Sequence, residues 1–412
     1  MRRLLPFALA LLAACAGPRS ARRVPMDGVR TGLDALVEQD FAPLKGKRVG
    51  VLSNRSGVDR RGRPILELLA AAPGVTLAAV FSPEHGFAAA QDATIASDTV
   101  RVAGRVLPVY SLYKGGISGM RPKPEQLAGL DVLVFDIQDI GARFYTYAAS
   151  MAMALEEAKA AGVTFMVLDR PNPLGGEVVE GPVLEDLELR KVTPTAYFPV
   201  PVRYGLTIGE VARLHNREVG HPDLVVMPLK GWKRTLWYDE TGLPWVPPSP
   251  NIPDLDAASL YPGIGIFESA NLSVGRGTPL PFRWIGAPWM DAEKVVALVS
   301  GQVDGVEFSV QDYTPTKRDK RDYLGELCHG VRIKVTDRDA MRPLAVFRHL
   351  ALALREVHPR EFAFRWDETK RMTGVEEFRR LWETGAGMEA FTALFDKGPQ
   401  DFEKARREVL LY

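Results

Sequence analysis

Three carboxylate side chains follow apolar stretches of the chain, at positions where they could exchange protons with a bound substrate. Glu84 comes after one such stretch, and Asp136 and Asp139 come after another. Hydrolysis of a glycosidic bond needs a proton donor for the leaving oxygen and usually a second carboxylate. Because neighbouring carboxylates favour the neutral form of a donor, Asp136 and Asp139 would suit Glu84 to this role. Taken alone, Glu84 also fits a surface turn, since Pro-Glu pairs are common in loops.

Asp136 and Asp139 belong to a longer polar and aromatic cluster within residues 131–147. This segment opens with an apolar run and continues with closely spaced polar and tyrosine residues around a single glycine. Polar residues just past the carboxyl end of a buried strand lie where open α/β sheets place their ligand crevice. The alternative is structural, with Asp136 capping the next helix and Arg143 pairing with a carboxylate. The crowding of hydrogen-bonding and aromatic groups favours a ligand site.

The elements that must position these residues alternate between strand and helix from residue 45 onward. This alternation indicates a parallel sheet with crossover helices, a Rossmann-like α/β arrangement. Thr207 and Glu210 have the spacing of a capping box at the start of one helix. Strands are expected at residues 48–53, 76–81, 131–136, 163–168 and 223–227, and helices at residues 64–72, 144–161 and 207–219.

Polar residues follow four of these strands. They are Asn54 after the first, Glu84 and His85 after the second, residues 136–139 after the third and Asn172 after the fourth. In a parallel sheet the carboxyl ends of neighbouring strands lie along one edge, so these groups should converge there. This convergence is the strongest indication of a site that the residues provide by themselves.

Several common kinds of site are missing from the sequence. No Gly-rich dinucleotide fingerprint follows the first strand, and neither a phosphate-binding P-loop nor a G-x-S-x-G elbow is present. We therefore expect no cofactor. His85 and Glu84, together with Asp136 and Asp139, could hold a divalent metal, but their spacing matches no recognised metal motif, so no metal site is predicted.

A second concentration of polar and aromatic residues lies in residues 231–289. It contains five of the seven tryptophans of the chain, whose faces could stack on sugars or simply form core. The same region carries Asn251 in a proline-rich stretch, followed by Glu268 and Asn271. Arg276 lies in a Gly-flanked loop, where a guanidinium could bind a carboxylate of the substrate or form a structural ion pair.

The first thirty residues read as a targeting segment and tether. Two arginines precede a short apolar run that ends in Leu-Ala-Ala-Cys at Cys15, which looks like a bacterial lipobox. We expect an exported protein, anchored to the membrane of the cell envelope through lipid on Cys15, although an ordinary signal peptide would also fit. The net charge of +1 gives no indication of a nucleic-acid partner.

The length of 412 residues favours two domains after this segment. We expect residues 1–30 to be signal and tether, residues 31–240 a Rossmann-like domain, and residues 241–412 a smaller α+β domain. In the second domain, strands are expected at residues 306–310 and 330–336. Helices are expected at residues 343–358, 378–383 and 399–411.

Taken together and in order, the motifs PEHGF, FDIQDIGARFYTY, DRPNPLGG, TGLPWVPPSPNIP, YPG and GRGT resemble the NamZ-type exo-β-N-acetylmuramidases. The resemblance runs from about residue 48 to residue 412. It implies that the chain is a bacterial enzyme that releases N-acetylmuramic acid from the non-reducing end of peptidoglycan fragments. It also implies that the active site lies in a cleft between two domains. It also implies that Glu84 is the general acid/base and Tyr261 a second catalytic group.

Combining the residues with the resemblance, we expect Glu84, Tyr261 and Asp136 to be catalytic. The residues expected to bind substrate are Asn54, His85, Gln138, Asp139, Arg143, Tyr145, Asn172, Asn251, Glu268, Asn271 and Arg276.

The sequence departs from the family pattern at Val274, Leu280, Arg283 and Tyr204. The first three lie in the loop expected to contact substrate, which puts the sugar preference in doubt more than the reaction type. Two alternatives therefore remain open. One is a non-catalytic lipoprotein that binds peptidoglycan fragments, and the other is a metal-dependent hydrolase.

Overall fold

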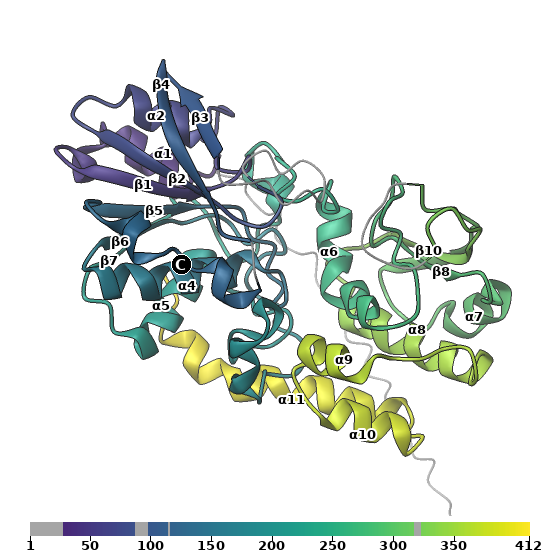
Figure 1. Cartoon of the computed structure of the whole chain (residues 1–412). Helices are drawn as coiled ribbons and strands as arrows, with labels where there is room; N and C mark the ends of the chain where they lie inside the picture. Colours follow the sequence, from purple (N-terminus) through teal and green to yellow (C-terminus); the bar gives the residue numbers. More distant parts are fainter. Residues whose placement is uncertain (1–27, 87–97, 114–115, 317–322) are drawn as a thin grey trace, which may run out of the picture.

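The chain folds into two domains that lie side by side (Figure 1). The computed structural model describes residues 28–86, 98–113, 116–316 and 323–412. Cys15 and the expected targeting segment lie outside the described residues. None of the helices in the described ranges combines the length and the apolarity needed to cross a membrane.

The first domain is built on the predicted parallel sheet. Within the described residues, seven strands lie in the spatial order β3-β4-β2-β1-β5-β6-β7, and neighbouring strands are parallel except for the antiparallel β3–β4 pair. The five predicted strands are confirmed, whereas the β3–β4 hairpin was not predicted. The strands are β1 (Arg48–Ser53), β2 (Thr76–Ser82), β3 (Asp98–Val102), β4 (Arg105–Ser111), β5 (Val132–Asp136), β6 (Thr164–Leu168) and β7 (Leu224–Met227).

Alternate residues of the central strands enter two separate cores. In β5, Val132 and Val134 pack with helices on one face, while Leu133 and Phe135 pack with helices on the other. Because both faces are covered, the strand is apolar from Val132 to Phe135, and Asp136 comes at its end. Helices α1 (Gly32–Glu38) and α2 (Ile65–Ala71) cover the first face, and α3 (Pro124–Leu127), α4 (Tyr147–Ala161) and α5 (Ile208–Val219) lie on the second.

The helix boundaries follow local hydrogen bonding. The capping box of α5 is confirmed: Glu210 N donates to Thr207 Oγ1 at 3.2 Å and Thr207 N to Glu210 Oε2 at 3.0 Å. Helix α4 begins at Tyr147, three residues later than predicted. The residues before it form a turn instead, in which Tyr145 N donates to Ala142 O at 2.9 Å, while Arg143 N donates to Val202 O at 2.8 Å.

The second domain packs helices against a small antiparallel sheet of spatial order β8-β10-β9. Strands β9 and β10 and helices α8 and α10 confirm the predictions, whereas β8, α6, α7 and α9 were not predicted. Helix α11 begins eleven residues before the predicted start, with Pro399 inside it. The elements are α6 (Leu255–Ile264), β8 (Trp284–Ala287), α7 (Ala292–Val299), β9 (Val306–Val310), β10 (His329–Val335), α8 (Pro343–Val357), α9 (Trp366–Thr373), α10 (Glu377–Glu383) and α11 (Met388–Arg407).

Short 3-10 helices connect several of these elements. They are η1 (Ala42–Leu44), η2 (Ile117–Met120), η3 (Leu187–Lys191), η4 (Pro194–Ala196), η5 (Tyr238–Thr241) and η6 (Gly265–Ser269).

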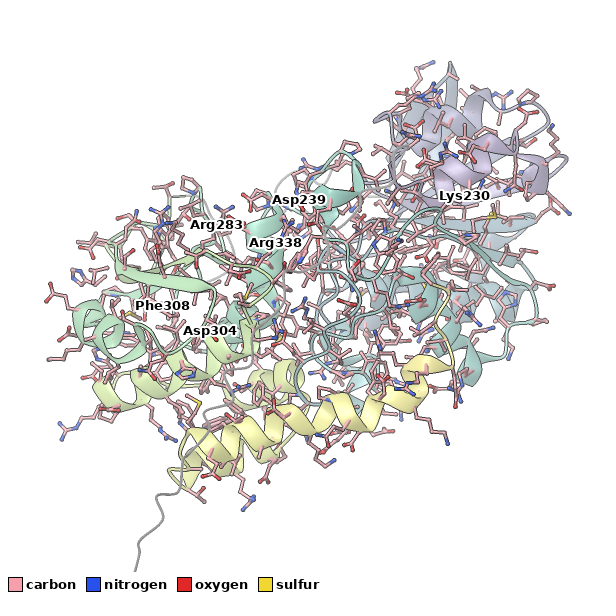
Figure 2. All side chains as sticks on the ribbon, turned by 180° about the vertical axis from the view of Figure 1, so that it is seen from behind. Lys230, Asp239, Arg283, Asp304, Phe308 and Arg338 are labelled. Atoms are coloured by element: carbon pink, nitrogen blue, oxygen red, sulfur yellow. The ribbon has the colours of Figure 1, made fainter. Side chains whose placement is uncertain are left out.

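Several contacts tie the domains together, including the following two. Asp239 of η5 and Arg338, after β10, point toward one another and form an ion pair of 2.6 Å (Figure 2). Helix α11 then carries the chain back to the first domain (Figure 1), where the Tyr412 hydroxyl donates to Asp169 Oδ2 at 2.7 Å. The expected division at residue 240 therefore separates the two domains along most of the chain. The residues after α11 are the exception, because they pack on the first domain.

Candidate active site

A pocket of about 340 Å³ lies between the two domains, in agreement with the expected cleft. The first domain contributes residues that follow β2, β4 and β5 and residues beside η4: Glu84, His85, Tyr113, Phe144, Tyr145, Thr146, Tyr147, Thr193, Pro194 and Thr195. The rest of the lining comes from later in the chain: Ser249, Asn251, Ile252, Tyr261, Glu268, Ser269, Leu272, Ser273, Val274, Arg276, Phe282, Glu368, Arg371 and Met372.

Glu84 reaches this pocket because β2 ends two residues earlier and the chain turns at once. His85, the next residue, has a left-handed backbone with φ of 67°, a conformation that side chains rarely adopt. Thr146, at the start of α4, donates from Oγ1 to Glu84 Oε2 at 2.7 Å. This contact holds one oxygen of the half-buried carboxylate. The structure thus places Glu84 in the pocket, and its catalytic role stays a prediction.

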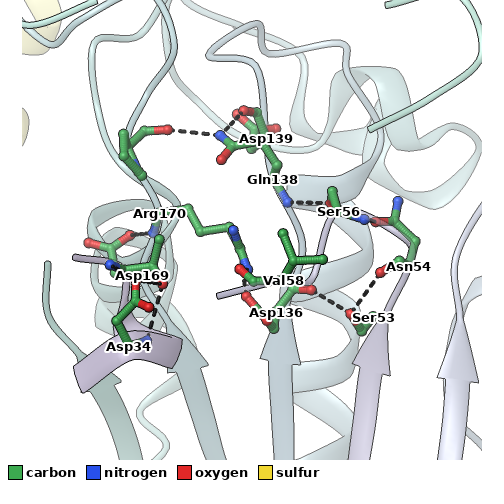
Figure 3. Close-up of polar contacts among 12 residues, drawn as sticks. Asp34, Ser53, Asn54, Ser56, Val58, Asp136, Gln138, Asp139, Asp169 and Arg170 are labelled. Atoms are coloured by element: carbon green, nitrogen blue, oxygen red, sulfur yellow. Dashed lines mark hydrogen bonds and ion pairs between the residues drawn. The ribbon is translucent and has the colours of Figure 1, made fainter. Parts of the chain in front are cut away.

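Asp136 and Asp139 do not line the pocket. Asp136 is fully buried, and Arg170 donates from Nε to its Oδ1 at 2.6 Å (Figure 3). Asp139 accepts hydrogen bonds from Gly141 N at 2.7 Å and from the Tyr204 hydroxyl, and burial raises the pKa of its carboxyl to about 6. The structure therefore contradicts the prediction that Asp136 and Asp139 contact substrate or face Glu84 across the cleft.

The polar groups at the carboxyl ends of the strands do converge, but they bind one another. Figure 3 shows this arrangement, which we call the edge network. Ser53 Oγ donates to Asp136 O at 2.7 Å, Gln138 N donates to Ser56 Oγ at 2.9 Å, and Arg170 Nη2 donates to Val58 O at 2.9 Å. Its members are Ser53, Asn54, Ser56, Asp136, Gln138, Asp139, Asp169 and Arg170.

Three residues expected to bind substrate donate to buried backbone carbonyls instead. Asn54 Nδ2 donates to Pro248 O at 3.0 Å, Gln138 Nε2 to Pro171 O at 2.8 Å, and Asn172 Nδ2 to Leu206 O at 2.9 Å. All three are buried and none lines the pocket. The structure corrects these predictions, because the amides satisfy backbone carbonyls that would otherwise be buried without a donor.

The edge network nevertheless shapes the pocket through the proline-rich segment. Besides Asn54, the Tyr147 hydroxyl donates to Pro248 O at 2.9 Å, and Arg55 Nε donates to Pro247 O at 2.8 Å. These contacts hold residues 247–248 against the first domain. Ser249 and Asn251 follow directly and line the pocket, so the prediction for Asn251 agrees with its position.

Arg143 is a structural residue rather than a ligand contact. Its guanidinium is buried and donates to Pro182 O and Val200 O at 3.0 Å each and to Met372 O at 2.6 Å. Burial lowers the pKa of Arg143 to about 9. The prediction that it binds substrate is therefore wrong, and Arg143 instead joins the first domain to the end of α9.

The second domain supplies two of the predicted polar residues on one wall. Glu268 of η6 and Arg276 both line the pocket and pair at 2.5 Å between Oε1 and Nε. Asn271 is directed elsewhere, since its Nδ2 donates to Glu361 O at 2.7 Å and its Oδ1 accepts from Ala363 N at 2.9 Å. The structure thus contradicts a substrate contact for Asn271 and brings Glu268 and Arg276 together.

The aromatic wall consists of tyrosine and phenylalanine. Tyr261 of α6 lies 5.7 Å from Tyr145 and 4.7 Å from Phe282 between ring centroids. Burial, reinforced by Glu268, raises the pKa of the Tyr261 hydroxyl well above its usual value, so the phenol is neutral at physiological pH. Tryptophan is absent from the described lining, although the sequence pattern had drawn attention to it.

Of the four departures from the family pattern, Val274 lines the pocket. Leu280 packs beside the core around Trp284, and Arg283, labelled in Figure 2, pairs with Asp254. Tyr204 donates to Asp139 within the first domain. The altered loop therefore changes the described pocket mainly through one apolar side chain.

Several lining residues were not identified from the sequence. Thr146 lies in the polar cluster of residues 131–147, between Tyr145 and Tyr147, but it was not among the predicted site residues. Glu368 and Arg371 lie on α9, an element that was not predicted. Their signal was weak because a single arginine on a polar helix is ordinary in sequence. Within the described residues, no three His, Cys, Asp or Glu side chains are grouped so that they could hold a metal ion.

Comparisons with known proteins agree with this architecture. The model of the N-terminal domain of the exo-beta-N-acetylmuramidase NamZ matches residues 49–256, and that of its C-terminal domain matches residues 259–412. A protein described as the peptidoglycan beta-N-acetylmuramidase NamZ of Bacillus subtilis (strain 168) is 38% identical over 406 residues, which cover 98% of this chain and 96% of that protein.

Two solved structures of DUF1343 family proteins from Bacteroides fragilis NCTC 9343 have the same fold. One has a TM-score of 0.84 and 34% identity, covering 94% of this chain and 100% of that one. The other has a TM-score of 0.73 and 29% identity, covering 93% and 99%. With both domains matched in sequence along nearly the whole chain, the protein belongs to the NamZ family of exo-β-N-acetylmuramidases.

Proposed function

We propose that this protein is an exo-acting glycoside hydrolase that releases N-acetylmuramic acid from the non-reducing end of peptidoglycan fragments. The observation that carries the proposal is the position of Glu84, a half-buried carboxylate held by Thr146 in an interdomain pocket lined with aromatic rings. A pocket of about 340 Å³ suits one terminal sugar better than a long glycan chain. Family membership supports the same activity.

In this mechanism Glu84 gives its proton to the glycosidic oxygen as the bond from that oxygen to the anomeric carbon breaks. Water then supplies a hydroxyl group to the anomeric carbon, and its remaining proton restores the acid. Thr146 keeps the donor oriented, while the rings of Tyr145, Tyr261 and Phe282 present apolar faces to the sugar. Glu268 and the neutral hydroxyl of Tyr261 are the candidates for the second polar role in the pocket.

The alternative of a non-catalytic binder loses much of its basis in this geometry. It rested on the altered loop, of which Val274 lines the described pocket whereas Leu280 and Arg283 do not. Glu84, by contrast, stands in the pocket together with Glu268 and Glu368. Carboxylates in an enclosed, aromatic site favour hydrolysis over simple binding.

The test of Glu84 uses the variant Glu84→Gln, which keeps the shape of the side chain but cannot transfer a proton. With a disaccharide substrate, kcat should fall on the order of 10²–10⁴-fold, the usual worth of general acid–base catalysis. With a nitrophenyl glycoside, whose leaving group departs without protonation, the loss should be much smaller. Near-normal turnover of the disaccharide by a variant with an unchanged melting temperature would remove Glu84 from the mechanism.

The place of action follows from the N-terminal sequence. Leu-Ala-Ala-Cys ending at Cys15 supports export and lipid attachment to the cell envelope, which would keep the enzyme near its glycan substrate. One acyl chain binds a membrane only marginally, so stable attachment requires several. Cys15→Ser should move the protein from the membrane fraction to the soluble fraction in cell fractionation. Undiminished membrane association of that variant would refute lipid attachment at Cys15.

A further inference from the structure

The charged side chains that line the pocket differ in whether the protein already balances them. Arg276 pairs with Glu268 at 2.5 Å, and Glu368 accepts a hydrogen bond from Arg365 Nε at 3.0 Å. Arg371 is different, because no described residue pairs with its guanidinium, and its Nε is buried without a hydrogen-bond partner. Among the charged side chains that line the pocket, Arg371 is therefore a cation that no described residue balances.

A buried N–H group without an acceptor is costly, and a guanidinium remains charged at any physiological pH. Its planar fork matches the two oxygens of a carboxylate or phosphate. Arg371 thus has the properties of a site for an anionic group on a ligand in this pocket. Arg276 is less suited, because Glu268 already occupies its Nε and its guanidinium lies 5.2 Å from the ring centroid of Phe282.

The protein holds the helix that carries Arg371 in a fixed position. Arg143 of the first domain donates to Met372 O at 2.6 Å, directly after Arg371. Gly374 packs so closely on the guanidinium of Arg143 that a Cβ added to Gly374 would lie 2.6 Å from Arg143 Nη1. Lys370 pairs with Asp186 at 3.0 Å, which ties α9 to the first domain a second time. A side chain on so well held a segment can select a ligand by geometry as well as by charge.

We infer that Arg371 binds the carboxylate of the lactyl ether that distinguishes N-acetylmuramic acid from N-acetylglucosamine. This inference rests on the proposed function and identifies the residue that reads the substrate's charge. Glu84 acts at the glycosidic bond, whereas Arg371 lies on α9 of the other domain and recognises a group that does not react. Arg371 is therefore a specificity-determining residue of the pocket.

The experiment compares Arg371→Met with the matched control Arg379→Met. Arg379 lies on α10, pairs with Glu383 at 2.8 Å and is absent from the pocket lining. The substrates are nitrophenyl β-glycosides of N-acetylmuramic acid, of its neutral lactyl amide and of N-acetylglucosamine. For Arg371→Met, kcat/KM on the acid should fall on the order of 10- to 100-fold, chiefly through KM, as expected for a lost charge-assisted hydrogen bond. Turnover of the amide should change little, and the control should match the wild type on all three substrates.

Each result of this comparison bears either on the inference about Arg371 or on the proposed function. Equal losses on the acid and the amide would show that Arg371 acts through structure, and an unchanged preference for the acid would show that the carboxylate is read elsewhere. Either result overturns the inference. Arg371→Lys provides a second variant if Arg371→Met does not fold, and it should recover part of the preference because it retains the charge.

A wild-type protein that hydrolyses none of the substrates would count against the proposed function but not against the inference. In that case, calorimetric titration with free N-acetylmuramic acid and with its amide tests Arg371 directly. The acid should bind more tightly than the amide to the wild type, and this difference should shrink on the order of 10-fold or more in Arg371→Met. Equal affinities of the wild type for both ligands would overturn the inference.

Discussion

Two ion pairs of the protein lie in different surroundings. Asp136 and Arg170 pair at 2.6 Å with side chains that are 0% and 3% exposed, inside the edge network. Glu268 and Arg276 pair at 2.5 Å with side chains that are 19% and 28% exposed, on the pocket wall. The first pair is enclosed by neighbouring residues, since Ser53 Oγ donates to Asp136 O and the Arg170 guanidinium donates to Val58 O. The second pair is accessible to solvent and to a bound ligand.

This difference separates two uses of similar residues. Both pairs arise where polar residues collect after strands or in loops, so composition alone does not distinguish them. Burial does, because a sealed pair can only support the fold, whereas an accessible pair can change partners when a ligand arrives. The edge network thus supports the segment that carries Ser249 and Asn251, and the open pair belongs to the lining of the pocket.

The sealed pair should give the largest effect on stability. Arg170→Met removes one partner and leaves a buried carboxylate, which should lower the free energy of unfolding by about 3–5 kcal/mol. Urea denaturation at pH 7 measures this loss. A change below about 1 kcal/mol, the range of exposed pairs, would show that the sealed pair is no more important than an open one.

The pH dependence of this variant provides a control. Burial raises the pKa of the Asp136 carboxyl and Arg170 opposes that rise, so removing Arg170 raises the folded-state pKa further. The folded variant then retains a proton that the unfolded chain has released. Its unfolding free energy should accordingly increase as pH falls from the raised folded-state pKa toward the ordinary pKa of the unfolded chain. Replacing both partners, with Asp136→Asn in the Arg170→Met background, should remove most of this dependence.

The open pair should give the smallest effect on stability. Arg276→Met should reduce the free energy of unfolding by less than about 1 kcal/mol, since both side chains are partly exposed. Because Arg371 carries the preference for the acidic sugar in our proposal, Arg276→Met should also keep that preference. The same urea titration and the same nitrophenyl substrates measure both quantities. A loss as large as that of Arg170→Met would remove the distinction between the two pairs.

Much of the fold could be predicted because it depends on local patterns. The buried strands, the capping box at Thr207 and the position of Glu84 after β2 all follow from residues close together in sequence. Helix α6 was missed because Pro262 and Gly263 lie inside it. Gly263 is required there by tertiary contact, since a Cβ at that position would lie 1.9 Å from Pro343 O. Such a close approach leaves no local signal.

The roles of the site residues depended on partners far away in the chain. The prediction for Arg143 was wrong because its acceptors are 39, 57 and 229 residues distant, and all are backbone carbonyls without a characteristic side chain. Asn54 was reassigned for the same reason, since Pro248 O lies 194 residues away. Conversely, Arg371 could not be selected from sequence. What distinguishes it is its place in the pocket lining together with a guanidinium that no described residue pairs, and both depend on the tertiary structure.

The return of the chain to the first domain has a consequence for the order of folding. The Tyr412 hydroxyl donates to Asp169, which lies 243 residues earlier at the end of β6, and Leu411 N donates to Glu210 Oε1 at 2.8 Å. During synthesis the first domain emerges long before these partners exist. Its carboxyl edge therefore stays incomplete until Leu411 and Tyr412 have docked, so the first domain cannot finish folding independently of the end of the chain.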